Sequence, residues 1–379
     1  MAEIKIADIG RSLVAIKDIE EDEELFSEEP FVSCQFSWNV ACKYSACDFC
    51  MKPLETAEEN VKRLTGNPDY TLPHPEYSNT DKNLHTYCPD CRIRYCSRLC
   101  FDKAYDSYHK VLCLRSSILD PDNPLVILNE SWKQMHYPPE TATVMLIARI
   151  LAILKQHPSK AEIRSTLKIF CQKTVEEEAA LAHKLLGDKF ADQLSTLNNL
   201  FCVAFPDPEL QEFLQPDAFR SLLALIGRNA QGIGTSPFYQ WRTAIEESDL
   251  PEKEKKQLDK TIDQIYEDID QVSGTFLNTE GSGLYLKQSA ANHSCIPSAR
   301  VTFPQNNHVL SLVASRAIKK GEEIFISYLD ECELSRSKTS RQQALRENYL
   351  FNCNCERCEF GDSGESSSDS GDDDEEMSD

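Results

Sequence analysis

The cysteines constrain the fold of this chain more than any other feature of its sequence. Residues 47–113 contain four pairs with the spacing of metal ligands: Cys47 and Cys50, Cys88 and Cys91, Cys96 and Cys100, and His109 and Cys113. A tetrahedral zinc site needs four sulfur or nitrogen donors, which two such pairs supply, so the count fits two zinc sites. Spacing alone does not decide which pairs combine.

A third cysteine group lies near the end of the chain. The stretch "CNCERC" supplies three thiols, Cys353, Cys355 and Cys358, and a tetrahedral site would need a fourth donor. Cys295 lies beside a histidine in a tight turn and is one candidate. The other cysteines have no neighbour at ligand spacing: Cys34, Cys42, Cys171, Cys202 and Cys332.

Composition narrows the class of protein. The first ten residues show no secretory signal, so the sixteen cysteines favour metal binding over disulfides. There is no apolar run of 18 residues that would suggest a membrane span. The net charge of −22 argues against broad binding to nucleic-acid phosphates and suits a basic protein partner. The acidic segment 361–379 is expected to be a disordered tail, either a solvated end or an interaction segment.

Hydrophobic patterning predicts strands at both ends of the chain and helices between them. Residues 1–45 and 282–330 alternate apolar and polar residues, as strands do. Residues 138–274 have a helical period, with prolines opening the first helix and Gly274 ending the last. The glycine-rich "QGIGTS" at 231–236 lacks the lysine and spacing of a phosphate-binding loop, and we interpret it as a helix-ending loop.

Two further helical patterns complete this reading. In the helix expected before Gly274, the following apolar residues recur at three- and four-residue steps: Leu258, Ile262, Ile265, Ile269 and Val272. A last helix is predicted over 335–351. The expected fold is α+β, with one β-rich domain whose halves enclose a cysteine module and a helical block.

Five motifs together resemble a known family. "NHSCIPSA" at 292–299 and "GEEIFISY" at 321–328 look like the two signatures of SET-domain lysine methyltransferases, and "CNCERC" looks like their post-SET segment. "GRSLVA" at 10–15 resembles the opening glycine loop, with Ser12 in place of the second glycine. The paired cysteines of 47–113 resemble a MYND zinc finger. This order of motifs is similar to the SET and MYND domain-containing family of protein lysine methyltransferases.

The resemblance implies a division of the chain. The segments would be 1–46 for the N-terminal SET part, 47–113 for the MYND finger, 114–272 for a helical SET insert, 273–330 for the core SET region, 331–360 for the post-SET zinc segment and 361–379 for the tail. The gap of 37 residues between Cys50 and Cys88 is longer than a typical MYND finger carries. In that family the finger is a protein-binding surface, so a protein partner is expected there, and direct nucleic-acid binding is not.

The resemblance also implies three zinc ions. In a MYND finger the pairs interleave, so one ion would be bound by Cys47, Cys50, Cys96 and Cys100, and a second by Cys88, Cys91, His109 and Cys113. In the SET family the cysteine of the Asn-His-Ser-Cys motif joins the post-SET cysteines. The third ion would therefore be bound by Cys295, Cys353, Cys355 and Cys358.

By the same matching, the chain would transfer methyl groups from S-adenosylmethionine to lysines of basic proteins, such as histones or ribosomal proteins, in the cytosol or nucleus. Tyr328 would be the catalytic tyrosine beside the cofactor, and Phe276 and Tyr349 would line the lysine channel. The other cofactor contacts would be Arg11, Leu13, Ser289, Asn292, His293 and Phe351. Two alternatives are a catalytically weak adaptor that recruits partners, and a cysteine hydrolase that uses His293 and Cys295.

Overall fold

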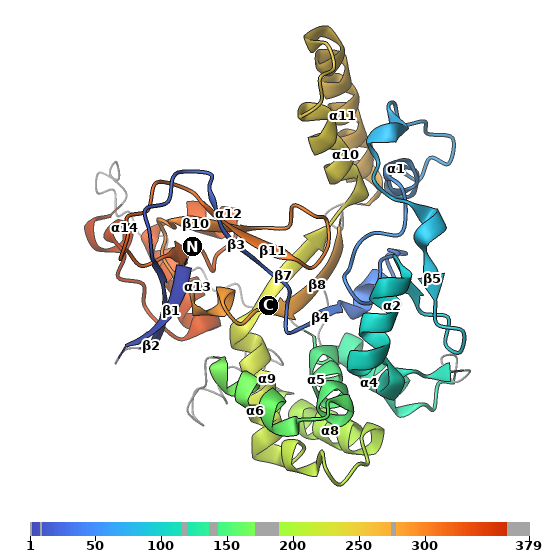
Figure 1. The fold of residues 1–379 in the computed structure, drawn as a ribbon, viewed down its shortest axis with the longest axis vertical. Coiled ribbons are helices and arrows are strands. Elements are labelled where there is room, and N and C mark those ends of the chain that lie inside the picture. Colours follow the sequence, from blue (N-terminus) through green and yellow to red (C-terminus); the bar gives the residue numbers. More distant parts are fainter. Residues whose placement is uncertain are drawn as a thin grey trace, which may run out of the picture.

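The structure is a computed structural model, and it describes residues 2–7, 10–115, 120–135, 143–170, 189–273 and 278–361. Within these ranges, no helix is both long and apolar enough to cross a membrane. In the view of Figure 1, strands occupy the centre, a group of helices lies below them, and a helical hairpin projects above.

Strands from distant parts of the chain meet in the same small sheets. The strands are β1 (Ala2–Ala7), β2 (Gly10–Ala15), β3 (Glu24–Glu28), β4 (Val32–Gln35), β5 (Thr86–Tyr87), β6 (Arg94–Tyr95), β7 (Ala230–Thr235), β8 (Thr279–Leu284), β9 (Asn292–His293), β10 (Ala299–Thr302), β11 (Leu310–Ala314) and β12 (Phe325–Ile326). β3 pairs with β11, which pairs with β10, and β8 lies between β4 and β7. The β-rich domain built from both ends of the chain is therefore confirmed.

One short parallel pair joins the two signature motifs. β9 holds Asn292 and His293, and β12 holds Phe325 and Ile326, with Asn292 opposite Phe325. The pairing places the "ANHSC" turn directly beside the segment that ends at Tyr328.

The prediction of a loop at 231–236 was wrong. Residues 230–235 form β7, which pairs with β8 along its whole length and places Gly234 opposite Glu280. The glycines suggested a loop because they have low strand propensity. Tertiary packing overrides that preference, since Ile233 is buried at 2% exposure between the sheet and the core. Ser236 then caps the next helix by accepting the Tyr239 N–H.

The helical block packs against the sheet of β4, β8 and β7, through contacts of α5 with β4 and of α9 with β7. Its helices are α4 (Pro124–Met135), α5 (Met145–Gln156), α6 (Lys160–Ile169), α8 (Phe190–Ala204) and α9 (Pro216–Asn229). α5 carries the apolar run predicted to be helical, and all of its residues from Leu146 to Leu154 are buried. The prolines expected to open this helix, and Gly274, lie outside the described residues.

A second helical unit is the hairpin of α10 (Pro237–Glu246) and α11 (Glu252–Val272), which projects from the body in Figure 1. The predicted stripe on α11 is buried at Leu258, Ile262, Ile265 and Ile269. Val272 was predicted to extend that stripe, but its side chain is 60% exposed. It is the last residue of α11.

The long insertion of the finger is an ordered arm that packs against this hairpin. It forms α1 (Ala57–Thr65), whose Val61 and Leu64 share one core with Trp241 of α10 and Ile265 of α11. Sequence reasoning missed this helix, although Thr56 and Glu59 form a capping box that signals its start. Further along the arm, His74 contacts Glu76 and, on α11, Glu254, each at 3.0 Å.

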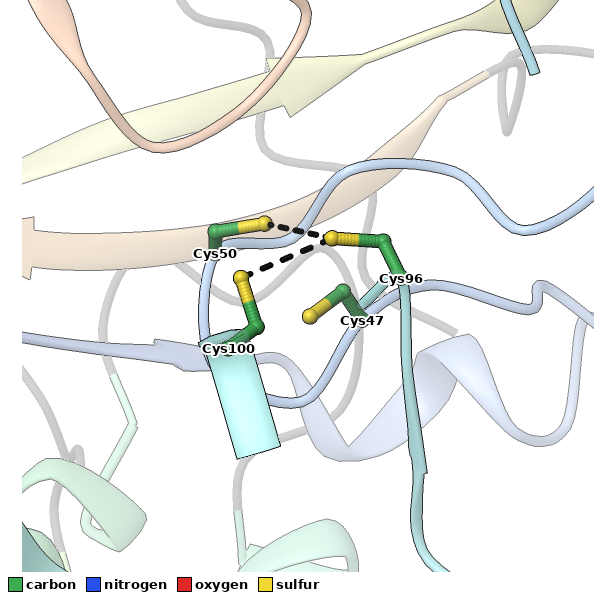
Figure 2. Close-up of side chains that lie close together, drawn as sticks. All are labelled: Cys47, Cys50, Cys96 and Cys100. Carbon is green, nitrogen blue, oxygen red and sulfur yellow. Dashed lines mark hydrogen bonds between the residues drawn. The ribbon is translucent and has the colours of Figure 1, made fainter. Parts of the chain in front are cut away.

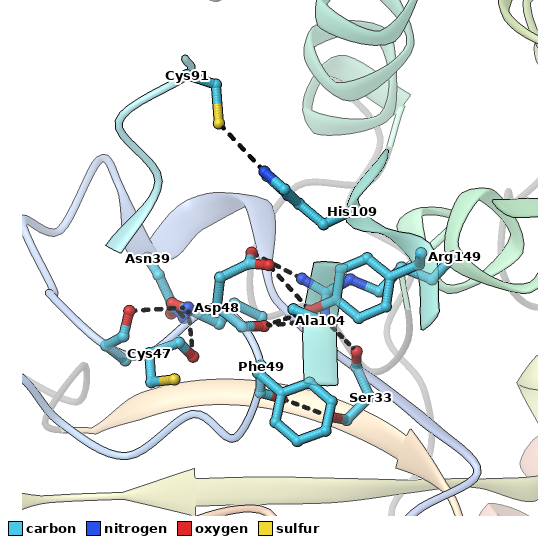
Figure 3. Close-up of polar contacts among 12 residues, drawn as sticks. Ser33, Asn39, Cys47, Asp48, Phe49, Cys91, Ala104, His109 and Arg149 are labelled. Carbon is cyan, nitrogen blue, oxygen red and sulfur yellow. Dashed lines mark hydrogen bonds and ion pairs between the residues drawn. The ribbon is translucent and has the colours of Figure 1, made fainter. Parts of the chain in front are cut away.

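A buried arginine joins the finger to the rest of the domain. Arg149 of α5 donates to the carbonyl oxygen of Ser33 at 2.7 Å, and to the carbonyl and carboxylate oxygens of Asp48 at 2.9 and 2.7 Å (Figure 3). Its guanidinium carbon lies 4.3 Å from the ring centroid of Tyr108, whose hydroxyl also donates to Asp48. Burial opposes the charge, but Asp48 raises the pKa of Arg149 above its usual value. Three segments far apart in sequence are therefore tied to one side chain.

The remaining helices belong to the finger and the C-terminal segment. In the finger, α2 (Arg98–Ala104) is followed by a wider helical turn, Tyr105–His109, and by α3 (Lys110–Leu112). The C-terminal segment consists of α12 (Glu331–Ser335), α13 (Lys338–Tyr349) and α14 (Glu356–Phe360). α13 matches the helix predicted over 335–351, apart from its first and last turns.

Candidate functional site: three cysteine clusters and a tyrosine-lined cavity

The first cysteine cluster lies in the finger (Figure 2). The structure brings together the predicted set, Cys47, Cys50, Cys96 and Cys100, with their sulfur atoms within 4.8 Å of one another. The Sγ atom of Cys96 lies 3.6 Å from that of Cys50 and 3.5 Å from that of Cys100. Four thiolates around a zinc ion at about 2.3 Å would lie about 3.8 Å apart, so the cluster has the dimensions of a zinc site.

The second cluster unites the other two pairs of the finger. Cys88, Cys91, His109 and Cys113 have their donor atoms within 4.8 Å of one another. Cys88 and Cys113 are 3.8 Å apart at sulfur, and the Cys91 sulfur is 3.5 Å from His109 Nε2, a contact also drawn in Figure 3. Burial lowers the pKa of His109, which keeps the imidazole neutral, the form that binds a metal. The interleaved arrangement expected from the resemblance is the one the structure adopts.

The third cluster joins the signature turn to the C-terminal segment. The sulfur atoms of Cys295, Cys353, Cys355 and Cys358 lie within 4.8 Å of one another, and Cys295 is 3.5 Å from Cys358. Gln342 of α13 fixes this segment further, since its side chain donates to the Cys353 carbonyl at 2.6 Å and accepts the Cys353 N–H at 3.0 Å. Each cluster offers four donors of the kind zinc prefers, so all three could hold the metal.

His293 links the third cluster to Tyr328. Its Nδ1 accepts the Tyr328 backbone N–H at 2.9 Å, so the ring proton of the neutral form must be on Nε2. Nε2 lies 3.4 Å from the Cys295 sulfur and therefore donates to it. A general base would have to accept the thiol proton at that nitrogen. The geometry therefore argues against a cysteine hydrolase, and it gives His293 a positioning role.

Two tyrosines line a cavity of about 590 Å³. Tyr328 donates its hydroxyl to the Ala291 carbonyl at 2.9 Å, and Tyr349 donates to the Tyr328 carbonyl at 3.1 Å. The two ring centroids are 4.9 Å apart. Burial, with Glu333 nearby, raises the pKa of Tyr349 to about 12, so this hydroxyl stays protonated at neutral pH. The cavity thus presents two aromatic rings with fixed hydroxyl groups.

Most of the residues expected to contact the cofactor lie in one contiguous set. Arg11 of β2 donates to the Ser289 carbonyl at 3.3 Å, and the Asn292 amide donates to the Arg11 carbonyl at 3.1 Å. The ring of Phe351 lies 6.0 Å from that of His293 and 6.2 Å from that of Tyr328, measured between centroids.

Two expected residues stand apart from this set. The side chain of Leu13 is fully buried in the core, so it could contact a cofactor only through its main chain. Phe276, predicted to line the lysine channel, lies outside the described residues. The structure adds cavity residues that sequence reasoning missed, among them Arg228, Gln231 and Glu280. Arg228 and Gln231 belong to the predicted helical block and its glycine-rich stretch, and Glu280 belongs to the predicted core SET region; no chemistry was assigned to any of the three.

Comparison with known proteins agrees with this architecture. The SET domain family model matches residues 10–329. The chain is 51% identical to protein-lysine N-trimethyltransferase SMYD5 of Gallus gallus and 49% identical to SMYD5 of Homo sapiens, over 92% of its length and 83% and 84% of theirs. It is 25% identical to human N-lysine methyltransferase SMYD2, over 75% of this chain and 50% of that protein.

From the long insertion in the finger and the acidic tail, the sequence is predicted to resemble the fifth member of the SET and MYND family most. The high identity to SMYD5 in two vertebrates confirms this prediction. The chain therefore belongs to the SET-domain family of protein-lysine methyltransferases, in its SET and MYND domain-containing branch and alongside SMYD5.

Proposed function

We propose that this protein transfers methyl groups from S-adenosylmethionine to lysine side chains of basic proteins, with histones and ribosomal proteins as candidate substrates. The observation that supports it best is the cavity beside Tyr328 and Tyr349, next to the cluster of Arg11, Ser289 and Asn292. The SMYD5 relatives are named trimethyltransferases, and we extend trimethylation to this chain. We also propose a nuclear or cytosolic location.

The residues of the cavity would prepare the lysine amine for transfer. S-adenosylmethionine supplies an activated methyl group on a positively charged sulfur. A lysine with a pKa of about 10.4 is protonated at pH 7, and its neutralisation costs about 4.6 kcal/mol. The rings of Tyr328 and Tyr349 exclude water from the amine, which disfavours its charged form. Their hydroxyl groups are held by main-chain carbonyls, so the walls of the channel are fixed before substrate enters.

We further propose that zinc occupies all three cysteine clusters. In the finger the two ions would hold the loops that carry Asp48 and Tyr108 against Arg149. In the third cluster the ion would tie the "CNCERC" segment to the Cys295 turn. Phe351 lies two residues before Cys353, so this ion would also hold Phe351 near His293 and Tyr328.

The experiment that tests the function combines purified protein, methyl-labelled S-adenosylmethionine and a lysate that lacks the endogenous enzyme. Wild type should label proteins, and Tyr328→Phe should label them about 100-fold less, because a fixed hydroxyl beside the reacting atoms is lost. Tyr239→Phe is the matched control, since Tyr239 is 59% exposed on α10. Equal labelling by wild type and Tyr328→Phe would refute the catalytic role of Tyr328, and an absence of labelling by wild type would favour the adaptor alternative.

A further inference from the structure

The cavity that holds the tyrosines continues along an open strand. β7 is at the edge of its sheet, and its residues from Ala230 to Gly234 line the cavity. Among the described residues, a side-chain carbon added at Gly232 would meet no atom within 4 Å, and one added at Gly234 would meet only Asn278, at 3.8 Å or more. The two glycines therefore leave this face of the strand free for a substrate peptide.

Different groups lie beside the two ends of β7. At one end, Gln231 bonds to Gln288 at 3.0 Å, next to the turn whose Ala291 carbonyl holds Tyr328. At the other end, Gly234 is paired with Glu280 of β8. Directly paired residues of an antiparallel sheet project from the same face, so Glu280 projects beside the open glycines. From Gln231 to Gly234 the strand advances about 10 Å.

Glu280 differs from the other carboxylates of the cavity. Asp330 and Glu333 form the capping box of α12, where each accepts a backbone N–H. The backbone of Glu280 is bonded to Asn39, but within the described ranges its carboxylate makes no hydrogen bond or ion pair. The carboxylate is half-buried, and burial raises the pKa of this carboxyl group. Burial of a charged carboxylate without a partner costs free energy. A cationic side chain of a substrate would offset that cost, and a neutral side chain would not.

We infer that Glu280 is a specificity-determining residue that selects substrates with an arginine or lysine about three positions from the target lysine. The inference rests on the proposed function, because it places the target lysine at the tyrosines and the peptide backbone beside Gln231. An extended peptide advances about 3.3 Å per residue, so three residues span the 10 Å to Gly234 and Glu280. A charge-assisted bond there should raise affinity about tenfold over a neutral residue.

The test is a scan of synthetic peptides with one central lysine in an alanine- and serine-rich context. Arginine, glutamate or alanine occupies each position from five before to five after the lysine. Two readouts are taken on the full-length protein: binding of the protein to each peptide, and incorporation of labelled methyl groups. We expect wild type to prefer arginine over alanine about tenfold at one position, two to four residues from the lysine on one side.

Three variants distinguish a specific role of Glu280 in substrate selection from a general effect of the protein's charge. Glu280→Gln should lose the preference for arginine and bind the alanine peptides as wild type does, and Glu280→Lys should prefer glutamate at the same position. Glu267→Gln, an exposed site on α11 that removes the same charge, should keep the wild-type profile. A profile that is flat in wild type, or unchanged in Glu280→Gln, overturns the inference. Selective binding without methylation by wild type would support the role of Glu280 and count against the proposed function.

Discussion

Replacement of Arg149 by methionine tests how the finger is held on the domain. The side chain of Arg149 is 7% exposed and that of Asp48 is 22% exposed, so the pair is largely shielded from water. Methionine fills a similar volume but removes the charged donor from Asp48 Oδ1 and from the Ser33 carbonyl, and the Asp48 carboxylate keeps only the neutral Tyr108 hydroxyl as a side-chain donor. Removal of one partner from a buried ion pair costs about 3–5 kcal/mol. In a protein of this size that loss lowers the melting temperature by roughly 4–6 °C.

The assay is thermal unfolding in zinc-containing buffer, with a matched variant. Arg164→Met removes a guanidinium from the neighbouring helix α6, where it pairs with Glu212 and lies over the ring of Phe213. Both side chains of that pair are exposed, at 41% and 56%, so its loss should cost about 1 kcal/mol or less. Equal melting temperatures for the Arg149 and Arg164 variants would refute the reasoning, since the burial of the Arg149–Asp48 pair would then contribute nothing to stability.

Three further predictions address other parts of the structure. Metal analysis should find about three zinc ions per chain, and Cys295→Ser should contain about two and bind S-adenosylmethionine more weakly; unchanged cofactor binding would contradict the link between the third cluster and the site. Gly281→Ala should lower the melting temperature, because the added carbon would lie 2.4 Å from the Cys34 carbonyl, whereas Gly232→Ala should not; equal effects would refute the packing argument. Two glutamates raise the pKa of His74, so its contribution to stability is full below about pH 6.5 and falls as pH rises through the raised value. The difference in melting temperature between wild type and His74→Gln should therefore be larger at pH 6 than at pH 8, and a constant difference would contradict this origin.

Much of the fold could be predicted because it depends on the spacing of residues along the sequence. Pairs such as Cys47 and Cys50 are set by local geometry, and the order of motifs along the chain implied how the pairs combine. The helical stripe of α11 followed from the period of Leu258 to Ile269. These signals depend on residues close in sequence.

The features that could not be predicted depend on contacts between distant residues. β7 is a strand because it pairs with β8, some 50 residues later, and its glycines gave no local sign of this. The role of Arg149 required Asp48 and Ser33 to meet it from other segments. Glu280 became notable only once the cavity and its position opposite Gly234 were known.

The most direct test of the central claim is mass spectrometry of a basic protein mixture after incubation with purified protein and S-adenosylmethionine carrying a heavy methyl group. The account predicts heavy methyl groups on lysine Nζ atoms with wild type, up to three per lysine, and a loss of about 100-fold with Tyr328→Phe. Heavy methyl groups on residues other than lysine, or equal incorporation by both proteins, would contradict it.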